Sequence, residues 1–188
     1  MKEMNRKIYL LGTSHEYQRN DDSCTENSIN EFMNYLRDIC KRYNIKSIAE
    51  EMSEEALEFY EKTISIPKVL SQELSDIAHQ YSDPNSEEKA KLGIKRSGYY
   101  TQGVQFPESM KLEELKGLTQ DEADLLEWEE DLKREPVWIE KILLLSNWPI
   151  LFICGSKHIE SFKKLLCERG ISVEVLHLNW QPMNLEYS

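Results

Sequence analysis

The sequence lacks any long apolar run. No stretch of its 188 residues is long and apolar enough to cross a bilayer. The first apolar run, residues 7–11, follows a polar N-terminus and has only five residues, which is too short for the core of a signal peptide. We therefore expect a cytoplasmic protein without a membrane partner.

Positive charge is also scarce. The chain has 23 Lys and Arg residues against 34 Asp and Glu residues, which gives a net charge of −11. Binding to a phosphate backbone depends on clustered Lys and Arg, so this balance argues against a nucleic-acid partner. The charge leaves small-molecule and peptide substrates open, and the sequence does not indicate an oligomeric state.

Cysteine pairs with CxxC spacing are absent, and so are internal repeats and low-complexity segments. The four cysteines are Cys24, Cys40, Cys154 and Cys167. In a cytosolic chain we expect them to be reduced. The length predicts a single domain over residues 1–188.

Apolar strands and helical patterns alternate along the chain. The expected strands are residues 7–11, 45–51, 148–154 and 171–178. A helical pattern over 26–43 separates the first two strands, and another over 157–169 separates the last two. Such crossovers connect parallel strands. The sequence therefore predicts an α/β fold with a mostly parallel central sheet flanked by helices.

The pattern in the middle of the chain, residues 53–146, predicts a helical insertion or lid. Helical patterning runs through residues 53–80, and a short helix capped by Asp83 should follow. Residues 94–118 are poorly patterned and should form loops around the site or an interface. From 119 the pattern is helical again, with a break at a proline near its middle.

Two of the expected strands end in the same motif. "LLGTSH" places Gly12 and then His15 after the first strand, and "FICGSKH" places Gly155 and His158 after the third. A glycine permits a tight turn and a close approach of a ligand to the backbone. In a parallel sheet, ligands bind outside the carboxyl ends of the strands. Both histidines should therefore face one site.

The second strand ends in Glu50 and Glu51. If the strands are neighbours, His15, His158 and one glutamate converge. Two imidazoles and a carboxylate are a common catalytic metal set that leaves positions open for water. The alternative is that the glutamates only favour the N-terminus of the following helix, since acidic residues stabilise that end.

Arg134 lies just before the proline that should open a late helix. A fixed guanidinium there could clamp a substrate carboxylate or phosphate, or orient a catalytic carboxylate; the alternative is a solvated charge at a helix end. Of the other histidines, His177 lies within the last strand and should be structural. His79, assigned to a helix, is a weaker site candidate.

The order of these motifs resembles the TraB/Tiki superfamily, which includes the GumN and PrgY groups and is distantly linked to ChaN and the erythromycin esterases. That family has two G-x-x-H motifs, a glutamate after an early strand and an arginine ahead of a late helix. The match covers roughly residues 7–52 and 130–178, with "CGSKHIESFKKLLCERGISVEV" as its most similar stretch. The middle of the chain has no clear counterpart.

The resemblance implies a metal-dependent protease with a divalent metal of the Mn or Co type. His15 and His158 would be metal ligands or catalytic histidines, and Arg134 would be the late arginine. Glu51 would be the matching glutamate because an apolar residue follows it, with Glu50 as the alternative. The sequence departs from the family at "REPVW", where the family often has Asn or Asp and an apolar residue.

The leading hypothesis is a metal-dependent hydrolase of a small-molecule or peptide substrate. A metal held by His15, His158 and Glu51 would lower the pKa of a bound water. The second glutamate, Glu50, would be the general base, and Arg134 would hold substrate or stabilise negative charge. The alternatives are a non-enzymatic protein that sequesters a peptide or small ligand, and a metal-independent esterase in which a histidine activates water directly.

Overall fold

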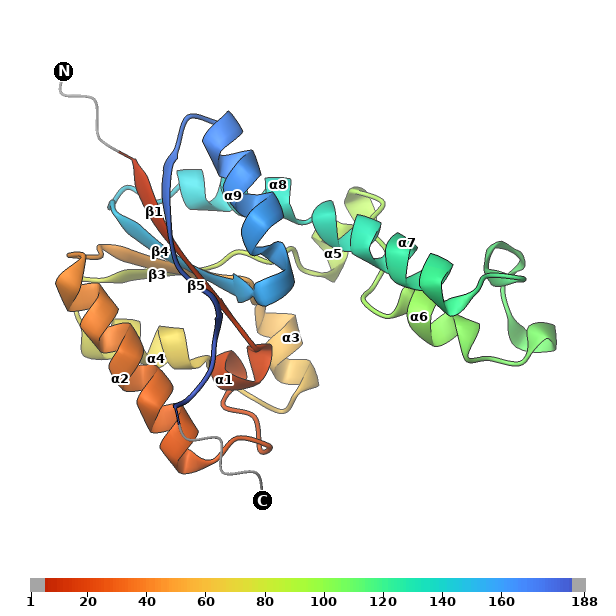
Figure 1. Cartoon of the computed structure of the whole chain (residues 1–188), viewed down its shortest axis with the longest axis horizontal. Helices are drawn as coiled ribbons and strands as arrows, with labels where there is room; N and C mark the ends of the chain where they lie inside the picture. The colour runs from red at the N-terminus through yellow and green to blue at the C-terminus, as the bar shows by residue number, and fades with distance from the viewer. Residues whose placement is uncertain (1–5, 184–188) are drawn as a thin grey trace.

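The computed structural model describes residues 6–183 and is built around one parallel sheet. The strand order is β3-β2-β4-β1-β5, and every neighbouring pair is parallel (Figure 1). The strands are β1 Lys7–Thr13, β2 Ser47–Glu50, β3 Ala78–Tyr81, β4 Ile150–Gly155 and β5 Ser172–Trp180. The α/β class with a parallel central sheet is thereby confirmed.

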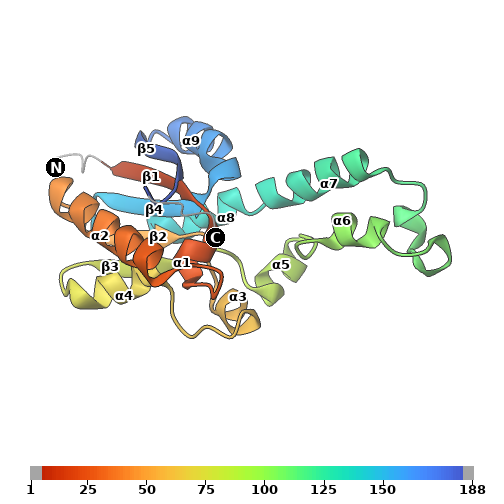
Figure 2. The same ribbon diagram turned by 60° about the horizontal axis from the view of Figure 1, so that its bottom comes forward.

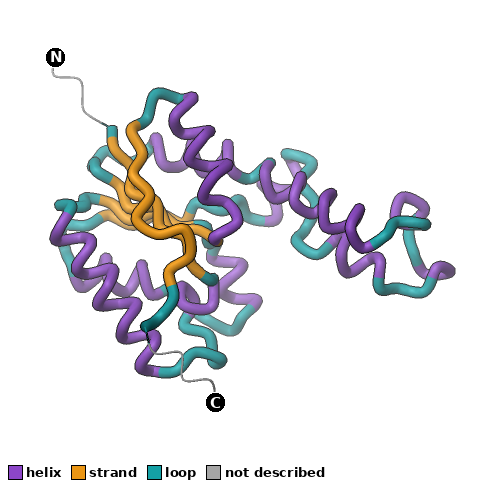
Figure 3. The backbone as a smooth tube through the Cα atoms, in the orientation of Figure 1, coloured by secondary structure: helices purple, strands orange, loops and turns teal. Residues whose placement is uncertain are grey.

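Helices lie on both faces of this sheet (Figure 3). They are α1 His15–Arg19, α2 Glu26–Arg42, α3 Glu54–Phe59, α4 Ile66–Glu73, α5 Ser86–Lys91, α6 Tyr99–Val104, α7 Gln120–Leu132, α8 Glu135–Leu143 and α9 Ile159–Glu168. Three short 3-10 turns are Glu108–Met110, Glu113–Leu115 and Ser156–His158. Because both faces are covered, β1 and β4 are buried along almost their whole length, which explains their continuous apolar runs.

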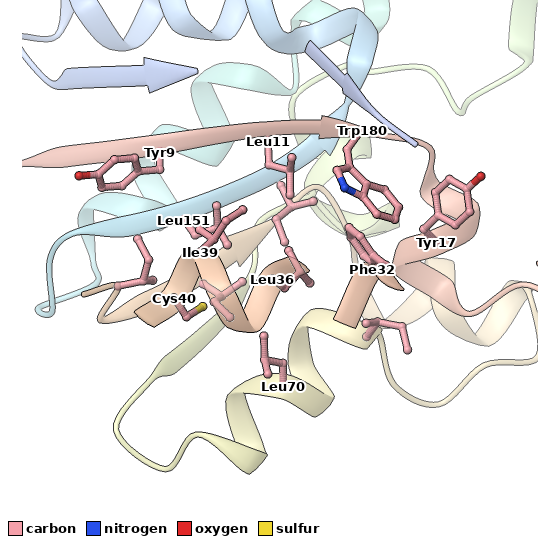
Figure 4. Close-up of a cluster of buried hydrophobic side chains, with 14 of the residues drawn as sticks. Tyr9, Leu11, Tyr17, Phe32, Leu36, Ile39, Cys40, Leu70, Leu151 and Trp180 are labelled. Atoms are coloured by element: carbon pink, nitrogen blue, oxygen red, sulfur yellow. The ribbon is translucent and has the colours of Figure 1, made fainter. Parts of the chain in front are cut away.

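One core lies between the sheet and helices α1, α2 and α4. Figure 4 shows part of it, with side chains from Tyr9, Leu11, Tyr17, Phe32, Leu36, Ile39, Cys40, Leu70, Leu151 and Trp180. The α2 residues recur at helical spacing, and α2 therefore turns one apolar stripe to the sheet. Trp180, at the end of β5, closes this core against Tyr17 and Phe32.

The second core lies on the opposite face, under α8 and α9. Alternate residues of a strand point to opposite faces, so Ile8 and Leu10 lie here while their neighbours in β1 face α2. Trp138 of α8 is fully buried and contacts the rings of Phe152 and Phe162. This packing places the start of α8 beside the carboxyl end of β4.

The segment from α5 to α7 extends away from the sheet as an arm (Figures 1 and 2). Within it, α6 lies against α7, and backbone N–H groups of Lys95, Gly98 and Tyr100 donate to Glu127 and Glu130 of α7. Residues 94–118, expected as loops, contain α6 and two of the 3-10 turns. The arm returns to the sheet at the junction of α7 and α8.

The expectation of helix through residue 80 is wrong. Helix α4 ends at Glu73, and Ala78–Tyr81 form β3, the edge strand beside β2. His79 therefore lies on a strand. The four residues are only half-buried and lack an apolar run, so pairing with β2 rather than local pattern creates the strand.

One expected helix cap also needs correction. Asp83 does not cap α5; Asn85 does, in a capping box with Glu88. Pro67 stands in the first turn of α4, where its missing N–H costs nothing. Within residues 6–183, no helix combines the length and the apolar character needed to cross a bilayer.

Candidate functional site

The two Gly-x-x-His motifs end at the same edge of the sheet, because β1 and β4 are adjacent and Thr13 pairs with Gly155. The two glycines serve different purposes. A methyl group on Gly12 would lie 2.0 Å from the carbonyl oxygen of Leu178 in β5. A methyl group on Gly155 would instead lie 3.2 Å from Nε2 of His15. The first glycine admits a neighbouring strand, and the second leaves room for a functional side chain.

Glu51 stands at the centre of the site. It follows β2 directly and is almost fully buried. Its Oε2 accepts a hydrogen bond from the backbone N–H of Gly155 at 2.8 Å and lies 3.6 Å from Nε2 of His15. Its Oε1 lies 2.9 Å from Nη2 of Arg134 and 3.5 Å from Nε2 of His158. The structure thus brings together four of the predicted residues.

The carboxylate of Glu51 is held in its charged form. Burial alone would raise its pKa, but the positive charges of His15 and Arg134 beside it outweigh that effect. The pKa of Glu51 therefore lies well below its usual range. Glu51 is a fixed anion at neutral pH and is not a proton acceptor there.

Arg134 bridges the site to the arm from the turn between α7 and α8. Its Nη1 pairs with Asp83 at 2.9 Å, and its Nη2 pairs with Asp131 at 3.0 Å as well as with Glu51. Burial lowers the pKa of Arg134, but the three carboxylates more than offset this and raise it. Trp138 donates to the same Asp83 oxygen at 3.1 Å, which ties the ion cluster to the second core.

His158 is buried, and its contacts define its tautomer. Arg134 can only donate, and its Nη2 lies 3.2 Å from Nε2 of His158, which must therefore accept. The other nitrogen, Nδ1, lies 2.8 Å from Oε1 of Glu135, a carboxylate that accepts. The neutral ring of His158 thus carries its proton on Nδ1. Both of its nitrogens are occupied, so it orients Arg134 and Glu135 rather than facing solvent.

His15 is the histidine that faces the pocket. Ser14 caps α1, so His15 begins a helix immediately after β1. About 36% of its side chain is exposed, and its Nδ1 lies 2.7 Å from Oε1 of Gln18, one turn along α1. Burial lowers the pKa of His15, but the negative charge of Glu51 and the hydrogen bond to Gln18 raise it above its usual value.

The other predicted glutamate, Glu50, does not reach the pocket. It is fully buried behind the site, where its carboxylate accepts from Ser65, from His79 at 2.7 Å and from Gln18 at 3.3 Å. The sequence alone left open which glutamate acts. The structure places Glu51 against the two motif histidines and Glu50 against His79.

The pocket in front of these residues has a volume of about 460 Å³. Part of its lining is apolar and comes from Met52, from Phe59 at the end of α3 and from Tyr60, which follows it. The lining also carries charge. Arg19 stacks on the ring of Tyr60, and Lys89 pairs with Asp83 at 2.8 Å. The arm contributes further polar side chains, so the site opens between the sheet edge and the base of the arm.

The predicted metal ligands do not fit a resident metal as they are arranged. The guanidinium of Arg134 lies within 3.2 Å of both Glu51 and His158, so two of the three donors already hold a cation. Among the described residues, no group of three or more His, Cys, Asp and Glu side chains has an arrangement suited to a metal ion. The metal stays a prediction from the sequence, and we derive no chemical step through it.

Sequence reasoning gave no role in the site to four residues that hold it together. They are Gln18, Asp83, Asp131 and Glu135. The sequence could have indicated Gln18, because it lies three residues after His15 and residues three apart share one face of a helix. In the sequence, Glu135 stands out only as a departure from the family motif, yet its carboxylate accepts a hydrogen bond from His158. The acidic partners of Arg134 have no signal in the local sequence.

Comparison with family models, with curated proteins and with solved structures found no match to this chain. The resemblance to the TraB/Tiki superfamily therefore stays a prediction from sequence motifs. What the structure defines is an α/β protein with two histidines, a buried glutamate and an arginine at the carboxyl edge of its sheet. Because one fold hosts many activities, function has to be argued from this site.

Proposed function

We propose that this chain is a hydrolase of esters or amides in which His15 activates water without a metal. One observation carries the proposal. Of the two histidines that meet at Glu51, His158 has both nitrogens occupied, whereas His15 is partly exposed, lines the pocket and has no hydrogen-bond partner at Nε2 among the described residues. Only His15 has a nitrogen that a water or a substrate can reach.

The reaction would proceed by general base catalysis. Neutral His15 accepts a proton from water at Nε2 while the water oxygen attacks the carbonyl carbon of the substrate. The tetrahedral intermediate then collapses, the bond to the leaving oxygen or nitrogen breaks, and His15 returns the proton to that atom. Acid and alcohol, or acid and amine, are the products.

Glu51 would act on this reaction through charge. Its Oε2 lies 3.6 Å from Nε2 of His15. Because its pKa is well below the usual range, Glu51 stays ionised and stabilises the imidazolium that forms when His15 takes the proton. Arg134, anchored by three carboxylates, holds Glu51 in place.

The pocket supports a substrate with an apolar part next to the scissile bond. Met52, Phe59 and Tyr60 offer an apolar wall on the α3 side, and 80% of the Phe59 side chain is exposed at the rim. Such a wall can hold an acyl or aryl group while the bond to be cleaved faces His15. A small-molecule ester or a peptide meets that description.

The test is a hydrolysis assay on the full chain with matched substrates. Initial rates are measured on p-nitrophenyl butyrate, on the corresponding p-nitroanilide and on p-nitrophenyl phosphate, each with EDTA and with added Mn²⁺ or Co²⁺. We expect ester or amide turnover that EDTA does not abolish. His15→Gln should lower kcat/KM by at least about 100-fold, the usual contribution of a general base.

His177→Gln is the matched control, because His177 is an exposed histidine of β5 outside the pocket. It should leave the rate unchanged. Equal rates for wild type and His15→Gln would refute the proposal. Activity that EDTA removes and Mn²⁺ restores would favour the metal-dependent form, and binding of a substrate analogue without turnover would favour a sequestering protein.

A further inference from the structure

A buried glutamine connects His15 to Glu50. We infer that Gln18 is a positioning residue that fixes the tautomer of His15, so that its Nε2 carries the lone pair that accepts the proton. This inference rests on the proposed function, in which His15 is the general base. It also gives a role to Glu50, a buried carboxylate that the proposed reaction does not use directly.

The surroundings of Gln18 fix the orientation of its amide. Its side chain is fully buried, and its Nε2 lies 3.3 Å from Oε2 of Glu50 and 3.5 Å from the carbonyl oxygen of Ile153. Both neighbours are acceptors, so the amide must turn its NH₂ group toward them. Its Oε1 consequently faces His15 at 2.7 Å and can only accept.

An acceptor at that place decides where the proton of neutral His15 lies. Nδ1 must carry the hydrogen that Oε1 of Gln18 accepts, and Nε2 is left with a free lone pair at the pocket. This is the same logic by which a carboxylate orients the histidine of a serine-protease triad. Here an amide transmits the effect from Glu50 to His15.

Glu51 pulls the proton the other way. Its carboxylate lies 3.6 Å from Nε2 of His15, beyond hydrogen-bond distance but close enough to favour a proton on that nitrogen. Without Gln18, neutral His15 would place its hydrogen on Nε2 and point it at Glu51. The base would then lack a lone pair where the water must bind. Gln18 therefore counteracts the attraction of the proton toward Nε2 by Glu51, the same anion that stabilises the imidazolium.

The chain of hydrogen bonds from His15 through Gln18 to Glu50, which we call the relay, ends at a carboxylate that is held firmly. Glu50 accepts from Ser65 and, at 2.7 Å, from Nε2 of His79 as well as from Gln18. These donors hold the carboxylate of Glu50 in one place. If the amide of Gln18 rotated by half a turn, its oxygen would face that carboxylate, which cannot donate a hydrogen bond. The pair of His15 and Gln18, one helical turn apart on α1, is thus aligned by residues from β2 and β3 and by the residue that caps α4.

The tautomer can be measured directly by long-range ¹H–¹⁵N correlation on ¹⁵N-histidine-labelled full chain. The chain has four histidines, and His15→Gln identifies the His15 signals. Spectra are recorded at a pH above the titration of His15, where its ring is neutral. We expect a protonated Nδ1 and an unprotonated Nε2. A wild-type His15 with its proton on Nε2 would overturn the inference, whatever the variants do.

Two variants at Gln18 and one control extend the test. Gln18→Met has a similar shape but no acceptor, and should move the proton toward Nε2 and lower kcat/KM roughly 10- to 100-fold, as loss of such an orienting partner usually does. Gln18→Glu keeps an oxygen facing Nδ1; beside Glu50 its second oxygen should hold a proton and donate it to that carboxylate, so the tautomer should be retained. Gln120→Met makes the same substitution at an exposed glutamine of α7 outside the pocket, and should leave the tautomer unchanged.

The outcomes separate this inference from the proposed function. If Gln18→Met keeps the wild-type tautomer, or if Gln120→Met changes it as much as Gln18→Met does, Gln18 has no specific role and the inference fails. If the tautomers follow the expectation but the chain hydrolyses none of the test substrates, the relay stands and the proposed hydrolase does not.

Discussion

The two motif glycines, Gly12 and Gly155, should respond to the same substitution in opposite ways. Gly12→Ala would place a methyl carbon 2.0 Å from the Leu178 carbonyl oxygen and 2.8 Å from Cγ1 of Ile159. The contact at Gly155 is milder, because a methyl carbon there would lie 3.2 Å from Nε2 of His15. Alanine at 12 should therefore damage the fold, and alanine at 155 should damage the site.

The size of each effect follows from these distances. Non-bonded atoms pack best near 3.5–4.0 Å, and the obstacle at Gly12 is strand backbone, which cannot rotate away. Overpacking usually costs about 1–3 kcal/mol, so we expect a loss of about 3 kcal/mol or more. For a chain of this length the melting temperature should fall by roughly 6–12 °C.

Gly155 has φ −58° and ψ 141°, which alanine adopts freely. Alanine also reduces the entropy of the unfolded chain, which is worth about 0.4–1 kcal/mol and offsets the tight contact. Stability should therefore change by less than about 1 kcal/mol. The methyl group would nevertheless displace the His15 ring, and kcat/KM on an active ester should fall roughly 10- to 100-fold.

Urea unfolding followed by circular dichroism measures the first effect, and the p-nitrophenyl ester assay measures the second. Wild type and both variants are compared at one pH. A Gly12→Ala protein with wild-type stability would refute the packing of β1 against β5 described above. A Gly155→Ala protein with wild-type activity would refute the placement of His15 against the end of β4.

Three further perturbations test the ion cluster. Arg134→Met should cost about 3–5 kcal/mol in urea unfolding, because it leaves buried carboxylates unpaired, and Arg134→Lys should recover little of this. The pKa of His15 is raised in the fold, so its contribution to stability is complete below its usual pKa of about 6.5 and is lost as pH rises through the folded value; His15→Gln should flatten that decline, and His177→Gln should not. Glu135→Leu should cost about 1–3 kcal/mol in the same assay, since the Nδ1–H of His158 loses its acceptor.

The sheet was largely predictable because four of its strands carry apolar residues toward two buried faces. β4 is the clearest case, since five of its six residues are buried. The fifth strand, β3, was not predictable in this way. Its sequence AHQY has no apolar run, and it becomes a strand only by pairing with β2, from Ser47 and Ala78 to Glu50 and Tyr81.

The meeting of the two histidines was predictable because matched motifs at the ends of parallel strands reach the same edge. The choice between Glu50 and Glu51 was not, because consecutive residues face opposite ways and the sequence does not say which way is the pocket. The partners Asp83 and Glu135 were beyond local pattern as well. They reach Arg134 and His158 from separate elements, so only the tertiary fold creates these contacts.

The balance of charge around Arg134 explains why carboxylates and a histidine, which could also bind a metal, here hold a guanidinium. Glu51, Asp83 and Asp131 surround it, and Lys89 adds a second cation, through Asp83. Releasing the guanidinium would leave buried carboxylates uncompensated, which is costly. Three carboxylates thus face two fixed cations, and a proton on His15 supplies the missing positive charge. The site is therefore already arranged to favour the imidazolium that a general base forms when it takes a proton from water.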